Sequence, residues 1–160
     1  MGELSGDDLR ALETGPVFRF ADWPNPSVPR VAAGVYTVWL PDGRLLYVGM
    51  SGRGLRVDAD DSRRRGLWTR LNSHASGRRS GDQFRVYVCD RLIVPTLTRS
   101  QQQELAVGDL SLDTVTRDFI RANLAYRFVT TPDSEAAFAL ERSVQRGALE
   151  AGKPILNSES

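Results

Sequence analysis

The stretch from residue 34 to 49 constrains the fold most strongly, because it predicts a β-hairpin with a tyrosine on each arm. Residues 35–40 are mostly β-branched or aromatic, a Pro-Asp-Gly turn follows, and residues 44–48 are again mostly apolar. The two arms carry Tyr36 and Tyr47. Aromatic residues on paired strands more often pack than react, so the hairpin alone predicts structure and not function.

Length and composition predict one domain. With 160 residues and 41% apolar content, the chain can form an ordinary core without disulfides or metal ions. We expect an N-terminal helix and proline-rich arm at 1–30 to pack on a domain at 31–160, with insertions near 50–65 and 90–124. The single cysteine, Cys89, cannot form an internal disulfide, which favours a reducing compartment. No apolar run has the length of a membrane span, so we expect a cytoplasmic protein without a membrane partner.

Hydrophobic periodicity predicts the remaining helices and strands. A period of two residues indicates a strand, and a period near 3.6 indicates a helix. We therefore expect strands at 84–89, with Cys89 buried, and at 125–130, and helices at 6–12, 66–74, 111–124 and 131–152, the last capped by Thr131 and ended by Gly152.

The predicted helix at 66–74 carries two candidate functional residues. Its apolar stripe consists of Leu67, Leu71 and later Ala75, whereas Arg70 and His74 lie four positions apart beside that stripe. The two polar side chains should therefore point to the same place. A histidine at a helix end without a specific task is the alternative interpretation of His74.

The long helix carries a third candidate, Glu141. Its predicted buried stripe consists of Ala137, Leu140, Val144, Ala148 and Ala151, and Glu141 lies at the edge of this stripe. A carboxylate at that position is half in the core. A lone glutamate there would normally extend its carboxylate into solvent or bond to Gln145.

Positive charge is concentrated between residues 53 and 79. The net charge of the whole chain is only +1, but this segment contains eight arginines against three aspartates, a net +5. Arginines at Arg53, Arg63, Arg64 and Arg65 are candidates for binding the phosphates of a polyanion. A solvated surface loop is the alternative interpretation.

Taken in order, these features resemble the GIY-YIG nuclease family. Each motif is weak alone, but the ordered set with an eleven-residue tyrosine separation is specific, and it extends from residue 34 to 157: Gly-Val-Tyr36, Tyr47-Val-Gly49, Arg70, His74, Glu141 and Pro-Ile-Leu-Asn157. The resemblance implies an α+β fold in which helices flank a small, mainly antiparallel sheet built on the hairpin. It also implies a metal-dependent endonuclease that hydrolyses phosphodiester bonds in DNA, which is favoured over RNA.

The same resemblance implies roles for individual residues. By this likeness Tyr36 and Tyr47 line the site, Arg70 contacts the scissile phosphate, and Glu141 holds one divalent ion. Gly49 and Asn157 would complete the substrate-binding pocket, and His74 resembles a histidine of some restriction-type members. A metal held by one carboxylate is better suited to Mg²⁺ or Mn²⁺ than to Zn²⁺, which prefers nitrogen and sulfur ligands.

One position departs from the family pattern and keeps a second hypothesis open. Many relatives have a lysine directly after the second tyrosine motif, where this chain has Met50, and Lys153 is its only lysine. A proton relay would then have to use His74 or water, since a tyrosine with a pKa of about 10 is a poor base alone. The alternative is a catalytically weak module that binds nucleic acid or a protein partner. Strandedness, recognition sequence and a homodimeric state are left open.

Overall fold

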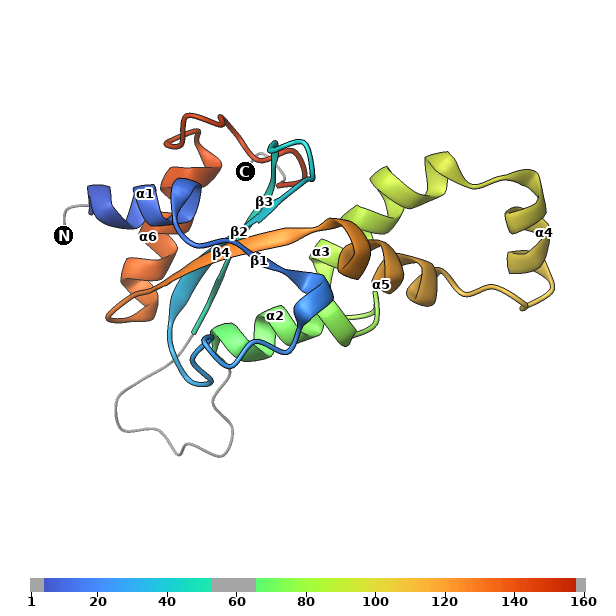
Figure 1. The fold of residues 1–160 in the computed structure, drawn as a ribbon, viewed down its shortest axis with the longest axis horizontal. Coiled ribbons are helices and arrows are strands. Elements are labelled where there is room, and N and C mark those ends of the chain that lie inside the picture. Colours follow the sequence, from blue (N-terminus) through green and yellow to red (C-terminus); the bar gives the residue numbers. More distant parts are fainter. Residues whose placement is uncertain (1–4, 53–65, 158–160) are drawn as a thin grey trace.

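The computed structural model describes residues 5–52 and 66–157, which form an α+β fold around a four-stranded antiparallel sheet (Figure 1). The strand order is β1-β4-β2-β3. The sequence prediction of a mainly antiparallel sheet flanked by helices is therefore confirmed. The elements in chain order are α1 (Gly6–Thr14), β1 (Phe18–Arg19), the 3₁₀ turn η1 (Phe20–Asp22), β2 (Gly34–Trp39), β3 (Leu45–Ser51), α2 (Leu67–Ser76), α3 (Gln83–Val88), the π-helical turn η3 (Cys89–Ile93), the 3₁₀ turn η4 (Val94–Thr96), α4 (Arg99–Ala106), α5 (Leu112–Asn123), β4 (Ala125–Thr130) and α6 (Ser134–Gln145).

Helices cover both faces of the sheet, so β2 is buried along its whole length. Alternate residues of β2 enter two separate cores, one with α1 and α6 and the other with α2, α3 and α5. Val35 and Trp39 pack in the first core, whereas Tyr36 and Val38 pack in the second. The candidate tyrosine Tyr36 consequently lies on the α2 side of a fully covered strand.

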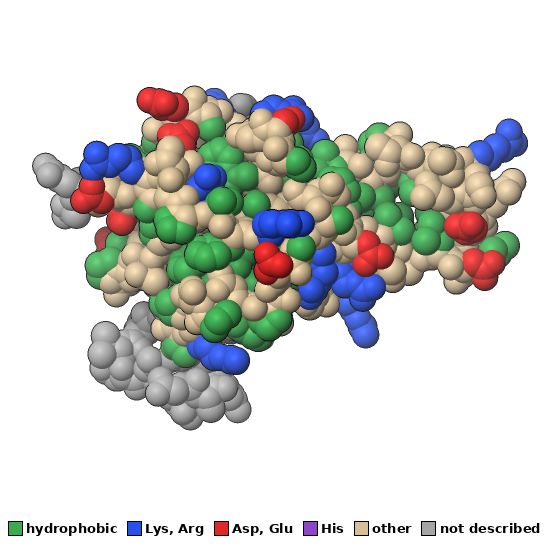
Figure 2. Space-filling view, viewed as in Figure 1, with side chains coloured by type: hydrophobic (Ala, Val, Ile, Leu, Met, Phe, Trp, Pro, Cys, Tyr) green, Lys and Arg blue, Asp and Glu red, His purple; other side chains and the backbone are tan. Residues whose placement is uncertain are grey.

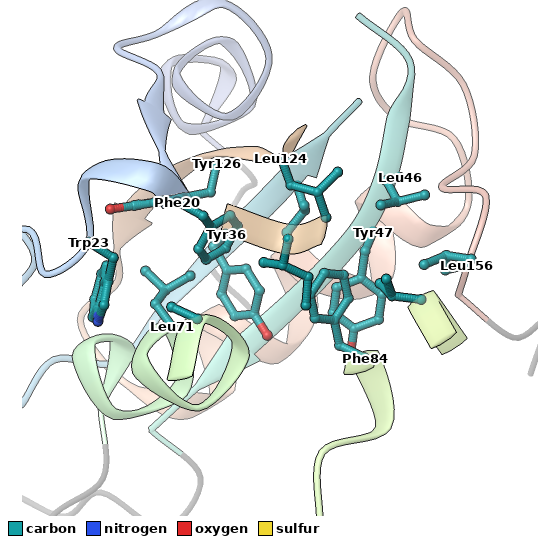
Figure 3. Close-up of a cluster of buried hydrophobic side chains, with 14 of the residues drawn as sticks. Phe20, Trp23, Tyr36, Leu46, Tyr47, Leu71, Phe84, Leu124, Tyr126 and Leu156 are labelled. Atoms are coloured by element: carbon teal, nitrogen blue, oxygen red, sulfur yellow. The ribbon is translucent and has the colours of Figure 1, made fainter. Parts of the chain in front are cut away.

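The predicted hairpin is confirmed, and its register places both tyrosines on one face. Tyr36 pairs with Gly49, and Val38 pairs with Tyr47. A register shift follows, because Trp39 pairs with Leu45 and leaves Leu46 as an extra residue on β3. Tyr47 therefore shares the α2-side core with Tyr36, two ladder positions away (Figure 3).

The strand expected at 84–89 is wrong. Residues Gln83–Val88 form the short helix α3, whose N-terminus is capped by Asp82 through a bond from the Arg85 amide to its carboxylate (3.2 Å). Phe84 and Val88 are buried one helical turn apart. The spacing of the apolar residues is compatible with both a strand and a helix, and the N-cap bond of Asp82 stabilises the helix.

The last predicted helix is shorter than expected. Its N-cap is Asp133 and not Thr131, since the Asp133 carboxylate accepts a hydrogen bond from the Ala136 amide (2.8 Å). The helix ends at Gln145, and Gly147 then adopts a positive φ of 98°, well before Gly152. The three stripe residues inside the helix are buried as predicted, but Ala148 and Ala151 lie beyond its end and are exposed.

Two chain segments complete the sheet edges. Phe18–Arg19 of the N-terminal arm pairs with β4, and Trp23 of the arm is buried, with its indole N–H donating to the Asn72 side chain (2.9 Å). Near the C-terminus, the amides of Ile155 and Leu156 donate to carbonyls of β3 (3.2 and 2.8 Å), which covers its outer edge.

None of the helices in the described part of the chain has the length and hydrophobicity that crossing a bilayer requires. The segment near 90–124, which was expected to be an insertion, contains η3, η4, α4 and α5, and α4 lies at the far end of a projection away from the sheet (Figure 1).

Candidate functional site

A pocket of about 560 Å³ lies where β3 ends, between α2 and α6. Four candidate residues from four different elements line it: Tyr36 of β2, Tyr47 of β3, Arg70 of α2 and Glu141 of α6. The remaining lining residues are mostly small: Met50, Ser51, Gly52, Gly66, Thr69, Ser73 and Gly81. The structure thus brings together residues that are up to 105 positions apart in the sequence.

Tyr36 is held in place by its cross-strand partner, Gly49. A Cβ atom on Gly49 would lie 2.2 Å from the Tyr36 hydroxyl oxygen and 2.4 Å from the ring carbon that carries it. Only glycine leaves room for this tyrosine. Gly49 itself is buried and shapes the site through Tyr36, without lining the pocket within the described residues.

From the lining residue Tyr36, three buried polar side chains form a chain of short hydrogen bonds that leads away from the pocket. The Tyr36 hydroxyl lies 2.6 Å from Nε2 of His74, and Nδ1 of His74 lies 2.7 Å from a carboxylate oxygen of Asp82. The Ser73 hydroxyl donates to the same Asp82 oxygen (2.9 Å). His74 and Tyr36 have no solvent-exposed surface, and Asp82 is 2% exposed. Proton movement along this chain would therefore be shielded from bulk water.

Sequence reasoning missed Asp82. Its signal was available, since an aspartate immediately before a segment of helical spacing is a typical N-cap. The interpretation of 84–89 as a strand removed that signal. Because Asp82 is the N-cap of α3, it lies at the N-terminus of that helix, where its carboxylate contacts the His74 ring.

Burial sets the protonation states of the site. Burial raises the pKa of Tyr36 well above its usual value of 10.0, Tyr47 raises it further, and Arg70 partly opposes both. Burial likewise raises the pKa of Tyr47 to about 12. Burial lowers the pKa of His74 below 6.5, although its bond to Asp82 acts in the opposite direction. Near pH 7 both phenols are therefore protonated and the imidazole is neutral.

The pocket lining includes a basic and an acidic side chain, Arg70 and Glu141. Burial by itself lowers the pKa of Arg70, but Tyr36 and Asp82 outweigh it and hold the pKa above its usual value, so the guanidinium is charged. Burial alone would raise the pKa of Asp82, but hydrogen bonds from His74 and Ser73 bring it below its usual value. A cation and the partly exposed carboxylate of Glu141 thus line one cavity.

Aromatic packing fixes the rings of the site. Phe84 of α3 lies 4.5 Å from the His74 ring and 4.9 Å from the Tyr47 ring, measured between centroids. The Tyr36 and Tyr47 rings are 6.3 Å apart. Figure 3 shows Tyr36, Tyr47 and Phe84 directed toward one another across the α2-side core. Such tilted aromatic contacts leave the hydroxyl groups few alternative positions.

Not every predicted site residue reaches the pocket. The Asn157 side chain bonds instead to the backbone of Val48, accepting from its amide (2.8 Å) and donating to its carbonyl (2.9 Å), which fastens the C-terminal segment to β3. Arg53 and the three arginines at 63–65 lie outside the described residues. On the face shown in Figure 2, basic and acidic side chains are interspersed over the surface.

The donor groups of the pocket suit a hard divalent cation. Glu141 provides the one carboxylate among the described lining residues, and both ring nitrogens of His74 are engaged behind the wall. No group of three or more His, Cys, Asp or Glu side chains with metal-binding geometry occurs in residues 5–52 and 66–157. A single oxygen ligand fits Mg²⁺ or Mn²⁺, which keep water ligands and take phosphate oxygens, but not structural Zn²⁺.

Comparison of the chain with protein-family models, with curated proteins and with solved structures gave no match in any of the three.

Proposed function

We propose that this protein is a metal-dependent endonuclease that hydrolyses phosphodiester bonds in DNA, with a fold of the GIY-YIG type. The observation that carries the proposal is the convergence of Tyr36, Tyr47, Arg70 and Glu141 in one pocket. The resemblance was inferred from the order of these residues along the chain. Their meeting in space, from two strands and two helices, is a second observation that supports the proposal.

The pocket has the groups that phosphodiester hydrolysis requires. A phosphate under attack accumulates negative charge on its non-bridging oxygens, and the Arg70 guanidinium, which lines the pocket, would bind them. Glu141 would hold Mg²⁺ or Mn²⁺, which supplies further stabilisation of that charge when bound. The remaining lining residues are mostly small, and the pocket has a volume of about 560 Å³.

Tyr36 is the better candidate for receiving the proton of the attacking water. Its hydroxyl has a direct neighbour that can accept a proton, Nε2 of His74 at 2.6 Å, whereas the described contacts of Tyr47 are to aromatic rings. A buried neutral phenol with a raised pKa cannot be a base unless its own proton leaves at the same time. In this proposal His74 accepts the phenolic proton, the role that we assign to the lysine of many GIY-YIG family members.

We also propose the cytoplasm as the location, since the described cysteine Cys89 is free and buried. The arginines at 53 and 63–65 remain candidates for DNA phosphate contacts on sequence grounds alone. Backbone contacts from arginines would make binding strongly dependent on salt and weakly dependent on sequence.

One observation favours a second candidate function. Met50 lines the pocket at the position where many relatives have a lysine. Without the positive charge of that lysine, the protein would still bind phosphate through Arg70 but would not cut DNA. Such a protein would be a nucleic-acid-binding module. The two functions differ in one measurable property, the cutting of DNA.

The decisive experiment is nicking of supercoiled plasmid in Mg²⁺ or Mn²⁺, with EDTA as the metal-free control. We expect nicked circles only with metal, and loss of nicking in Glu141→Gln, whose amide keeps the shape of the side chain and removes its charge. Glu135→Gln is the matched control, because Glu135 is exposed in the first turn of the same helix. Binding without nicking under every metal condition would support the binding module, and nicking by Glu141→Gln at the wild-type rate would refute the metal assignment.

A further inference from the structure

Asp82 is a buried carboxylate that belongs neither to the family motif nor to the pocket lining. Its contacts indicate what it does. It contacts His74 at 2.7 Å on the side opposite to Tyr36. We propose that Asp82 is a positioning residue that fixes the proton of His74 on Nδ1, so that Nε2 is free to accept the phenolic proton of Tyr36.

Proton counting around Asp82 supports this assignment. An ionised carboxylate can only accept hydrogen bonds, and Asp82 accepts from the Ser73 hydroxyl (2.9 Å) and the Arg85 amide (3.2 Å). The short contact to Nδ1 of His74 therefore requires a proton on Nδ1. A neutral imidazole has one N–H, so Nε2 presents a lone pair, and at 2.6 Å the Tyr36 hydroxyl is the donor.

The backbone around His74 is held as firmly as its ring. Arg85 is completely buried, and its guanidinium donates to the backbone carbonyls of His74 (3.0 Å) and Asp113 (3.1 Å). The charged and titratable groups that face His74 are thus Asp82 and Arg85 from α3 and its cap, Tyr36 and Tyr47 from the hairpin, and Arg70 from its own helix. Among these described groups only Asp82 is placed to accept a hydrogen bond from Nδ1.

In the hydrolytic step, the water oxygen forms a bond to phosphorus while the bond to the leaving oxygen breaks, and the leaving alkoxide takes up a proton from water to become the free hydroxyl group. The proton lost by water passes to the Tyr36 oxygen as the phenolic proton passes to Nε2 of His74. The resulting imidazolium lies against the Asp82 carboxylate, which stabilises it, and the proton later returns through the Tyr36 oxygen to a water molecule in the pocket that Tyr36 lines. This step rests on the proposed nuclease function, whereas the tautomer of His74 does not.

The test uses the substitution Asp82→Asn. If the amide oxygen of the new side chain keeps the cap bond to the Arg85 backbone N–H, its NH₂ group must face Nδ1 of His74. That NH₂ donates to Nδ1 and forces the ring proton onto Nε2, where it points at Tyr36. Nε2 of His74 can then no longer accept the phenolic proton, although the side chain at position 82 keeps its volume. In serine proteases the same kind of change keeps the geometry and lowers kcat by about 10⁴ through the wrong tautomer.

His74 is the only histidine in the chain, so long-range ¹H–¹⁵N NMR of the full chain reads its tautomer without assignment. We expect the proton on Nδ1 in the wild type and on Nε2 in Asp82→Asn. The nicking kcat should fall about 10²–10⁴-fold with little change in KM, as removal of a proton acceptor predicts. Asp113→Asn is the matched control, since its carboxylate pairs with Arg79 away from the pocket, and it should retain the wild-type tautomer and rate.

A wild-type ring protonated on Nε2 would overturn the proposal even if Asp82→Asn does not fold. So would an Asp82→Asn protein that nicks at the wild-type rate. If the wild type shows no nicking with any metal, the proposed function fails, and the NMR measurement still decides the role of Asp82.

Discussion

Replacing Gly49 with alanine should disable the site by adding one methyl group outside the pocket. The new Cβ would lie 2.2 Å from the Tyr36 hydroxyl oxygen and 2.4 Å from its ring carbon, whereas real contacts of this kind are not found below 3.0 Å. The hydroxyl must therefore move by about 0.8 Å or more to restore ordinary contact. Gly49 does not contact the pocket, so the effect would act through Tyr36.

A shift of this size is incompatible with the Tyr36–His74 bond. At 2.6 Å the bond is already short, so movement toward His74 makes a clash and movement away lengthens it beyond the usual range for a hydroxyl donor. Tyr36 has no solvent-exposed surface, so its ring can shift only by displacing neighbouring side chains or by moving toward the pocket that it lines. Overpacking of this kind costs about 1–3 kcal/mol of stability, and a misplacement near 1 Å costs about 10²-fold in rate.

Chemical denaturation and plasmid nicking measure the two effects separately. Gly6→Ala is the control, because a Cβ on Gly6 would have no atom within 4 Å and Gly6 begins α1 far from the site in sequence. It should leave stability equal or raised by up to about 1 kcal/mol. A Gly49→Ala protein with unchanged stability and unchanged rate would show that the close packing of Tyr36 on β3 is not what positions its hydroxyl.

Two further outcomes follow from the charges of the site. Arg70→Ala should lower kcat/KM for nicking at least about 10²-fold, near 3 kcal/mol of transition-state stabilisation, with tertiary structure retained because the side chain is only half-buried; an unchanged value would remove Arg70 from phosphate binding. The pKa of His74 is lower in the folded state than its unfolded value of 6.5, so the unfolded chain binds more protons and stability should fall as pH decreases below about 6.5. Denaturation from about pH 5 to 7.5 should show that fall in the wild type and a smaller one in His74→Asn.

Local signals in the sequence were sufficient for the hairpin and for α2. The hairpin combines β-branched arms with a turn in which Gly43 adopts a positive φ of 87°. Helix α2 has the stripe of Leu67, Leu71 and Ala75, all fully buried. In both cases each residue that decides the structure lies only a few positions from the next one along the chain. Periodicity and turn chemistry are therefore reliable there.

Periodicity failed where two periods fit the same residues. Phe84 and Val88 are spaced for either a strand or one helical turn, and only the Asp82 side chain distinguishes the two. The end of α6 was wrong for a related reason, because Gly147 ends the helix five residues before the glycine that was expected to do so. Both errors lie at element ends, where a single side chain or a single φ angle decides the boundary.

The composition of the site could not be derived from periodicity at all. Tyr36 points from β2 into the core on the α2 side of the sheet, whereas Glu141 belongs to α6, which packs on the opposite side. The two side chains meet only because β3 ends beside both α2 and α6. That meeting depends on strand order, which local patterns do not determine. The expectation that they converge came from the resemblance, and Tyr36 and Glu141 line the same pocket.

The cost of burying polar groups gives an independent argument that the Tyr36–His74–Asp82 chain has a purpose. Each of these groups would be satisfied by water in the unfolded chain, so its burial gains little, and apolar residues of similar volume are often as stabilising. The fold nevertheless keeps a carboxylate, an imidazole and a phenol almost completely covered, and adds the buried guanidinium of Arg85 to hold the His74 backbone. Asp82 is needed as the cap of α3, but a cap needs no histidine, and a core needs no hydroxyl at Tyr36. A requirement for one fixed histidine tautomer beside the pocket explains all four residues together.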